Sequence, residues 1–154
     1  MKNFSIADMQ PAALARIMGN DDNPALAGIA YFYPAPMCGV YVKVEVFNLP
    51  DKDRINRSEF FGIHIHENGN CTKPFSMTGD HYNPDNNAHP DHAGDLPPLL
   101  STSGYAWTII YDGRISISDI IDKSLVIHDD KDDFTSQPSG DSGTKIACGV
   151  IIRL

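Results

Sequence analysis

The sequence predicts an all-β protein, with about eight antiparallel strands arranged as a β-sandwich or barrel. Valine occupies every second position from 40 to 46, and residues 41, 43, 45 and 47 fall on the opposite side of the same stretch. This is the period of a strand with one buried face. Clusters of Pro, Gly, Asn and Asp separate further apolar runs of similar length, as turns between strands do.

The strands are expected at short intervals along the chain. They cover residues 13–19, 27–33, 40–47, 59–66, 104–110, 113–118, 124–128 and 145–154. Asp112 and Gly113 suit a tight hairpin turn between two of these strands. No long helix is predicted, although residues 118–122 could form a single turn.

Size and charge limit the kinds of protein that this chain can be. With 154 residues, 42% of them hydrophobic, one domain over residues 1–154 is expected. A net charge of −8 argues against nucleic acid or an anionic membrane as partner. No apolar run is long enough to span a bilayer. The N-terminal residues lack a signal peptide's apolar core, so a cytoplasmic protein is expected, with an exported mature form as the alternative.

All six histidines lie in or beside two segments without strand alternation, residues 68–103 and 129–144. Long loops in a compact domain are usually functional or disordered. His64 and His66 are two apart on a predicted strand, so their rings project from one face and could grip a metal ion. A solvent-facing pair fits that local pattern equally well.

A denser group of metal-ligand residues follows in the first long segment. It consists of His81, His89, His92 and Asp95, and His128 ends a later predicted strand. Nitrogen and carboxylate donors of this kind suit zinc. Seven candidate ligands fall one short of two four-ligand sites. Either one imidazole bridges two metals, or one site keeps an open position, and the count leaves both readings open.

Five ordered motifs resemble the bacterial type of the Cu,Zn superoxide dismutase family. They are "GIHIHENGNC", "GDHYNP", "HAGD", "LVIHDDKDDF" and "SGTKIACGV", and they run from about residue 26 to the C-terminus, whereas residues 1–25 match poorly. The resemblance implies an eight-stranded Greek-key barrel with two long functional loops. It also implies an oxidoreductase that binds copper and zinc and converts superoxide to dioxygen and hydrogen peroxide.

The resemblance also implies a role for each matching residue. Copper is assigned to His64, His66, His81 and His128, and zinc to His81, His89, His92 and Asp95. His81 is then the bridging and catalytic imidazole, and Asp132 matches an aspartate that hydrogen-bonds histidines of both sites. Cys71 and Cys148 match the family's disulfide, which leaves Cys38 as a packed or surface thiol.

Two positions depart from the family pattern. Lys145 stands where the family usually has an arginine that guides superoxide to copper, so the charge is kept but the planar fork of donors is lost. The spacing of His89 and His92 in "HPDH" is short compared with the eukaryotic branch, and Pro90 could supply the turn that brings both rings to one zinc.

Two other functions remain open at this level. One is a non-catalytic copper- and zinc-binding or buffering domain of the same fold, and the other is a zinc-only protein. Superoxide is the expected small-molecule partner, and relatives include homodimers, so a homodimer stays open.

Overall fold

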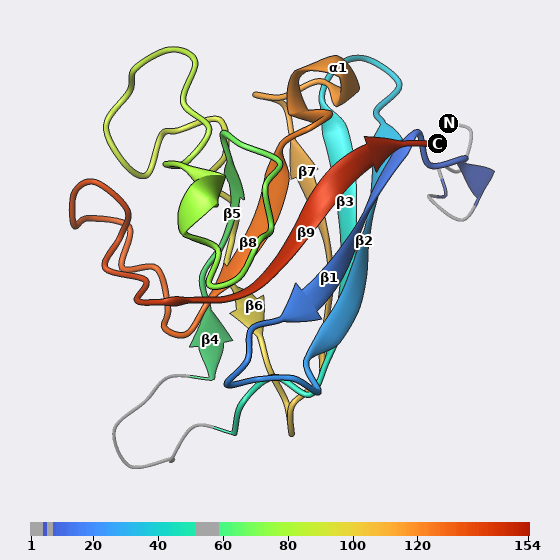
Figure 1. The fold of residues 1–154 in the computed structure, drawn as a ribbon. Coiled ribbons are helices and arrows are strands. Elements are labelled where there is room, and N and C mark those ends of the chain that lie inside the picture. The colour runs from blue at the N-terminus through green and yellow to red at the C-terminus, as the bar shows by residue number, and fades with distance from the viewer. Residues whose placement is uncertain (1–4, 6–7, 52–58) are drawn as a thin grey trace.

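The computed structural model describes residues 5, 8–51 and 59–154, and in this part the chain forms a curled antiparallel sheet (Figure 1). Seven strands form the main sheet in the order β5-β8-β9-β1-β2-β3-β7. Their bounds are β1 Ala13–Gly19, β2 Ala27–Pro34, β3 Val40–Phe47, β5 Ile63–His66, β7 Ala106–Asp112, β8 Ser124–His128 and β9 Lys145–Arg153. Two short strands, β4 Phe60–Phe61 and β6 Leu99–Leu100, pair separately. The predicted all-β fold is confirmed.

The connections are those of a Greek key. After β3 the chain crosses to the far end of the sheet, where β5 pairs with β8, and only later returns to pair β7 with β3. The last strand, β9, is inserted between β8 and β1. A strand that returns to pair with an earlier, non-adjacent strand defines this topology.

The alternation of valines in β3 has the predicted consequence. The side chains of Val40, Val42, Val44 and Val46 are fully buried in the core. The predicted strand 59–66 is instead interrupted at Gly62 and forms β4 and β5. A Cβ at Gly62 would lie 2.9 Å from the Ser142 side chain, so the close approach of a neighbouring loop accounts for the glycine.

The strand predicted at residues 113–118 is wrong, and so is the hairpin at Asp112. β7 ends at Asp112, whose Oδ1 accepts a hydrogen bond of 2.8 Å from the backbone N–H of Arg114. Helix α1, Ile117–Ile120, begins just after Ser116, whose N–H donates to Asp119 Oδ2 at 2.9 Å. These local side-chain bonds compete with strand pairing and favour a turn and a helix start.

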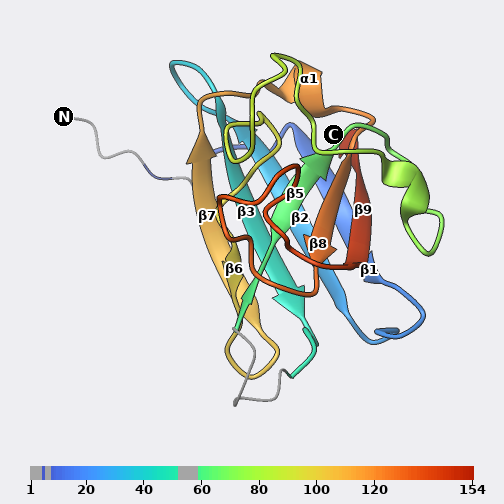
Figure 2. The same cartoon turned by 90° about the vertical axis from the view of Figure 1, so that its left-hand side faces the viewer.

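The two long segments lie over β5 and β8. Figure 2 views the molecule from this side and shows both segments toward the reader. The first also contains a short 3-10 helix, Ser76–Thr78, and β6, neither of which was predicted. Within the described ranges, no helix is long and apolar enough to cross a membrane.

The predicted disulfide joins Cys71 to Cys148, 77 residues further along the chain. It ties the first long segment to β9, next to the buried side chains of Phe75 and Val126. Cys38 is exposed between β2 and β3, so of the two expected positions, packed or on the surface, it takes the surface one. The disulfide therefore anchors one long segment to the main sheet.

Candidate metal centre

The two histidines of β5 are buried. His64 is 0% and His66 2% exposed, so the solvent-facing reading of this pair is wrong. The neighbouring isoleucines of β5 face the core, and the first long segment covers the histidine face. The cover is hydrogen-bonded to the middle of the strand: Tyr82 N–H donates to the carbonyl of Ile65 at 2.8 Å, and Ile65 N–H donates to that of Gly94 at 2.9 Å.

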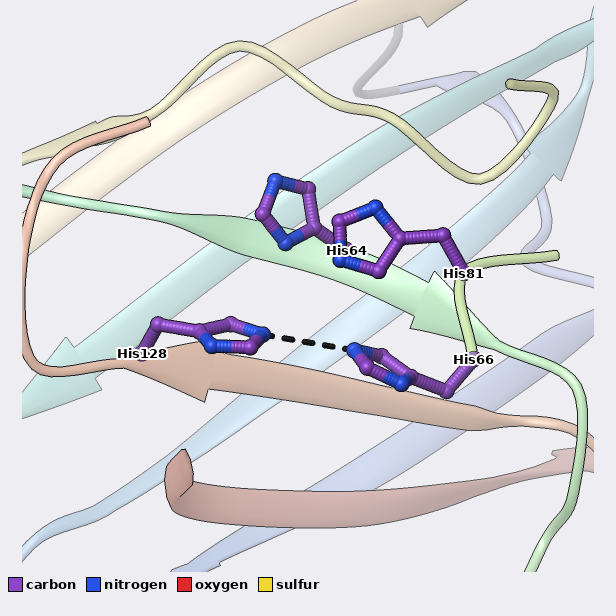
Figure 3. Close-up of side chains that lie close together, drawn as sticks. All are labelled: His64, His66, His81 and His128. Atoms are coloured by element: carbon purple, nitrogen blue, oxygen red, sulfur yellow. Dashed lines mark hydrogen bonds between the residues drawn. The ribbon is translucent and has the colours of Figure 1, made fainter. Parts of the chain in front are cut away.

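A first cluster forms around β5 and the end of β8 (Figure 3). Its members are His64, His66, His81 and His128, all buried, and one ligand-type atom of each lies within 4.8 Å of the others. The Nδ1 atom of His66 donates to the carbonyl of Gly79 at 2.9 Å, and that of His128 to the carbonyl of Gly143 at 3.2 Å. Because a carbonyl only accepts, each ring turns its Nε2 toward the other, 3.3 Å away.

Burial keeps the rings of His64, His66 and His128 uncharged. It lowers the pKa of His66 to about 2 and that of His128 to about 3, and repulsion between neighbouring imidazoles adds to the effect. Burial also lowers the pKa of His64, although a hydrogen bond to Asp132 opposes it. Metal ligation requires unprotonated imidazoles, so these three rings are ready to bind a metal at neutral pH.

A second cluster shares one ring with the first. Its members are His81, His89, His92 and Asp95, again with one ligand-type atom each within 4.8 Å of the others. The carboxylate of Asp95 lies 2.6 Å from His81 Nδ1, 3.1 Å from His89 Nδ1 and 3.2 Å from His92 Nδ1. His81 therefore directs Nδ1 to the second cluster, while its Nε2 remains available to the first.

Four buried ring nitrogens have no hydrogen-bond partner among the described residues. They are His64 Nδ1, His81 Nε2, His89 Nδ1 and His92 Nδ1. The last two lie near Asp95 but outside hydrogen-bond geometry. A buried nitrogen without a partner is costly unless something binds it. These atoms face the two clusters, so the donors fit one metal held by four imidazoles and a second held by three imidazoles and a carboxylate.

Asp132 links the two clusters. Its carboxylate accepts from His64 Nε2 at 2.7 Å and from His89 Nε2 at 2.9 Å, and the backbone N–H of Phe134 adds a third bond of 2.7 Å. Burial opposes the charge, yet the hydrogen bonds lower the Asp132 pKa to about 2. The carboxylate orients both rings so that each turns its Nδ1 toward its own cluster.

Gly140 makes this arrangement possible, and sequence reasoning missed it. Its φ is +70°, and a Cβ there would overlap Asp132 Oδ1 and lie 2.6 Å from His89 Nε2. Only glycine combines this backbone conformation with so close an approach. The serine- and glycine-rich stretch from 139 to 143 indicates a tight turn. It does not indicate that the turn passes close to the side chains of Asp132 and His89.

Two polar side chains that hold the second cluster were also missed. Gln137 accepts from the backbone N–H of His89 at 3.0 Å and donates to its carbonyl at 2.7 Å. Arg114 donates to the carbonyls of His92, at 2.9 Å, and Asp95, and its guanidinium also binds the carboxylate of Asp112. Neither lies in a recognisable motif, because both act on backbone groups distant in sequence.

The turn expected at Pro90 is present. Asp91 N–H donates to the carbonyl of Ala88 at 2.9 Å, and the His89 and His92 rings have centroids 5.5 Å apart. The short "HPDH" spacing thus brings both rings to Asp95.

Lys145 lies at the start of β9 beside an open cleft of about 440 Å³ next to the first cluster. Its Nζ donates to Thr78 Oγ1 at 2.7 Å and to the carbonyl of Gly79 at 3.0 Å, and partial burial lowers its pKa. Both acceptors are neutral, so the positive charge is not cancelled by direct pairing. Glu67 and Asp80 also line the cleft, so its field is mixed rather than purely positive.

Comparisons with known proteins agree with this geometry. The family model described as copper/zinc superoxide dismutase matches residues 27–151. The Cu-Zn superoxide dismutase of Deinococcus radiodurans is 31% identical over 163 aligned positions, which cover 92% of this chain and 84% of that protein.

Relatives with other names also match. The copper chaperone for superoxide dismutase of Rattus norvegicus is 37% identical over 105 residues, 60% of this chain, but the chain spans only 38% of the chaperone's length. Among solved structures, a double mutant of a superoxide dismutase-like protein from Bacillus subtilis aligns with a TM-score of 0.78 at 27% identity, covering 90% of this chain and 96% of that one.

Proposed function

The chain belongs to the copper/zinc superoxide dismutase family, and from this premise we propose that it removes superoxide by disproportionation at the two linked clusters. Copper and zinc are the family's metals, and both donor sets fit them. We assign copper to His64, His66, His81 and His128, and zinc to His81, His89, His92 and Asp95. The observation that carries the proposal is His81, which offers one ring nitrogen to each cluster.

The overall reaction consumes two superoxide anions and two protons and yields dioxygen and hydrogen peroxide. A bound copper ion supplies a one-electron couple, which accepts an electron from one superoxide and returns it to the next. His81 Nε2 has no partner among the described residues, so this atom can hold one of the two protons beside the cleft. His81 Nδ1 and Asp95 Oδ1 lie 2.6 Å apart, and with zinc bound both would ligate the same ion, which would keep the ring oriented while Nε2 gains and loses the proton.

The substrate is an anion and the protein has a net charge of −8, so attraction has to come from a local positive group. Lys145 supplies that charge beside His66 and His128. Its two hydrogen bonds to Thr78 and Gly79 hold Nζ in place. Glu67 and Asp80 partly offset its field, which predicts weaker steering than a purely basic entrance would give.

The test is to load the metal-free protein with copper and zinc, measure the metal content, and follow superoxide decay by stopped flow. One copper and one zinc per chain with second-order decay far above the spontaneous rate is the expected result. His81→Gln should bind less of both metals and lose the activity. Full metal content without turnover would overturn the catalytic assignment.

Two observations favour a non-catalytic copper- and zinc-binding protein as the second candidate. The relatives include proteins named as a copper chaperone and as superoxide dismutase-like, and the acidic groups in the cleft weaken the attraction of an anion. This candidate predicts that both metals bind without superoxide turnover. Zinc alone in the loaded protein would instead support the zinc-only reading.

A further inference from the structure

Two exposed acidic residues lie beside histidines of the first cluster. Glu67 follows His66 in the chain, and Asp80 precedes His81. The antiparallel bridge between His66 and His81 continues with a hydrogen bond from the N–H of Glu67 to the carbonyl of Asp80 at 3.0 Å. The two acidic residues therefore lie opposite each other on neighbouring backbone segments, and both line the cleft of about 440 Å³ next to the first cluster.

Neither carboxylate is neutralised by a direct partner. Within the described residues, no ion pair involves Glu67 or Asp80. Lys145 lines the same cleft, but its Nζ donates to Thr78 Oγ1 and to the carbonyl of Gly79 instead. Like charges that lie directly opposite each other on paired segments are unfavourable. A bound cation would remove this repulsion.

The buried side of the cleft contains nitrogen lone pairs without a proton. The Nε2 atoms of His66 and His128 face each other at 3.3 Å, although Nδ1 of each ring already donates to a carbonyl (Figure 3). His81 Nε2 is buried and has no hydrogen-bond partner in the described part of the chain. Lone pairs this close repel each other, and a buried acceptor without a donor is costly. These atoms line the same cleft as the two carboxylates and independently indicate a cation there.

We propose that Glu67 and Asp80 form a capture site for hydrated Cu(II), from which the ion passes to the first cluster. At a given site with oxygen ligands, Cu(II) binds more strongly than the other divalent ions of its row. Cu(I) prefers thiolates and thioethers, and among the described residues no cysteine or methionine lines the cleft. Imidazoles suit copper better than two exposed carboxylates do, so transfer inward is favourable. The capture site thus supplies the entry path that a buried metal site requires.

The charge around the cleft agrees with a cation as the captured species. Apart from the histidines, the charged residues that line it in the described structure are Glu67, Asp80 and Lys145, which leaves one negative charge in excess. The whole chain carries a net charge of −8. Both fields attract a cation and repel superoxide, so the groups that weaken substrate attraction favour copper loading. The proposal concerns how the first cluster is loaded and does not depend on superoxide turnover.

The test is the rate at which the zinc-loaded full chain takes up Cu(II), followed by stopped flow through the visible absorption of bound copper. Uptake by the wild type should slow as salt is added, because salt screens the attraction. Glu67→Gln with Asp80→Asn should lower the second-order rate constant about tenfold at low ionic strength and flatten its salt dependence. The electron paramagnetic resonance spectrum of bound Cu(II) should match that of the wild type, because the imidazole ligands are unchanged.

Asp51→Asn with Glu59→Gln is the matched control. It removes the same two charges from exposed residues that line a separate cleft, so uptake should stay within about twofold of the wild type. Lys145→Gln should raise the rate of copper uptake about threefold, the opposite of its expected effect on superoxide, because the two ions differ in sign. Far-ultraviolet circular dichroism verifies that every variant is folded.

Three results would each overturn the capture site. They are uptake by the Glu67 and Asp80 variant as fast as in the wild type, an equal loss in the matched control, and an altered spectrum of bound Cu(II). A wild type that takes up no copper would overturn it too, together with the copper assignment of the first cluster. The expected copper uptake without superoxide turnover would support the capture site and remove only the catalytic proposal.

Discussion

The two clusters contain similar ligands but are built differently. In the first, His64 and His66 lie on β5 and His128 ends β8, so the pairing of these strands sets their spacing. In the second, His89 and His92 lie on a loop, where Asp132, Gln137 and Arg114 hold rings and backbone. The sheet determines one site, while the other depends on single hydrogen bonds from distant parts of the chain. Variants that remove these hydrogen bonds should therefore affect the second cluster more than the first.

Loss of the disulfide should have the largest effect on stability. Cys148→Ser releases the first long segment from β9, and closure of a loop of this length is worth about 4–5 kcal/mol in the chain-entropy model. Urea unfolding of the metal-free protein should show a loss of that order. Cys38→Ser, at an exposed thiol, should change the unfolding free energy by less than about 0.5 kcal/mol. Equal effects of the two changes would contradict the anchoring role.

Acid should lower the stability mainly through two histidines of the first cluster, His66 and His128. The folded pKa values of His66 and His128 are about 2 and about 3, against about 6.5 in the unfolded chain. Below pH 6.5 the unfolded chain therefore binds protons that the folded chain does not. Stability is fully present above pH 6.5 and falls toward pH 3, by about 2 kcal/mol for each histidine at pH 5.

This prediction is checked by urea unfolding of the metal-free protein at several pH values. His66→Gln should flatten the profile, because glutamine does not titrate. A profile that is unchanged by the substitution would show that other groups dominate the acid response.

Asp132→Asn tests the link between the sites. An amide accepts through its oxygen alone, so His64 or His89 loses its partner. Zinc affinity should fall about 10- to 100-fold, the usual effect of losing a carboxylate that orients a metal ligand. Competitive titration of the metal-free protein measures it. Asp133→Asn is the matched control, since Asp133 bonds within its own turn to Thr135 and Ser136. Equal zinc affinity in the Asp132 variant and the wild type would show that Asp132 does not connect the two sites.

Arg114→Gln should separate the two sites. It removes charge-assisted hydrogen bonds to the carbonyls of His92 and Asp95, so the zinc affinity of the second cluster should fall roughly tenfold. The copper affinity of the first cluster should stay within about twofold. Spectroscopic titration with Co(II) in place of zinc, and with Cu(II), gives the two affinities. Arg153→Gln, at the exposed end of β9, serves as the control. A parallel loss at both clusters would show that Arg114 stabilises the whole fold instead.

Lys145→Gln should have the smallest effect, on the rate alone. Glutamine can still bond to Gly79, so the fold is retained, while the positive charge beside the cleft is lost. The rate of superoxide decay should fall about three- to tenfold at low ionic strength, and its dependence on salt should flatten. Lys131→Gln, at an exposed position, is the control. An unchanged rate and salt dependence would remove Lys145 from substrate attraction.

The first cluster is set by the sheet and the second by a loop, and this difference also explains which parts of the site could be predicted from the sequence. Strand alternation located β3, and it also placed His64 and His66 on one face of a second strand, β5, because alternate residues of a strand point the same way. The strand expected at 113–118 failed because Asp112 and Ser116 make local bonds that this period does not reveal. The disulfide followed from family resemblance, since three cysteines alone do not specify a pairing.

Apart from Asp132, which followed from the family resemblance, the side chains that support the second cluster were not predictable. Gln137 and Arg114 act on backbone carbonyls, which every residue carries, so no pattern of side chains identifies their targets. Gly140 is needed because of what lies next to it, and that neighbour comes from the tertiary fold. Metal ligands can be recognised from their residue type and local spacing, whereas the groups that hold them in place come from distant parts of the chain.

The shared carboxylate of Asp132 has a thermodynamic consequence. One ion that fixes His89 also fixes Asp132, and through it His64, so part of the ordering entropy for the other ion has already been lost. Linkage requires this advantage to be reciprocal: whatever factor zinc adds to copper affinity, copper adds to zinc affinity. The order in which the two ions arrive changes the path of assembly but leaves the total binding free energy the same.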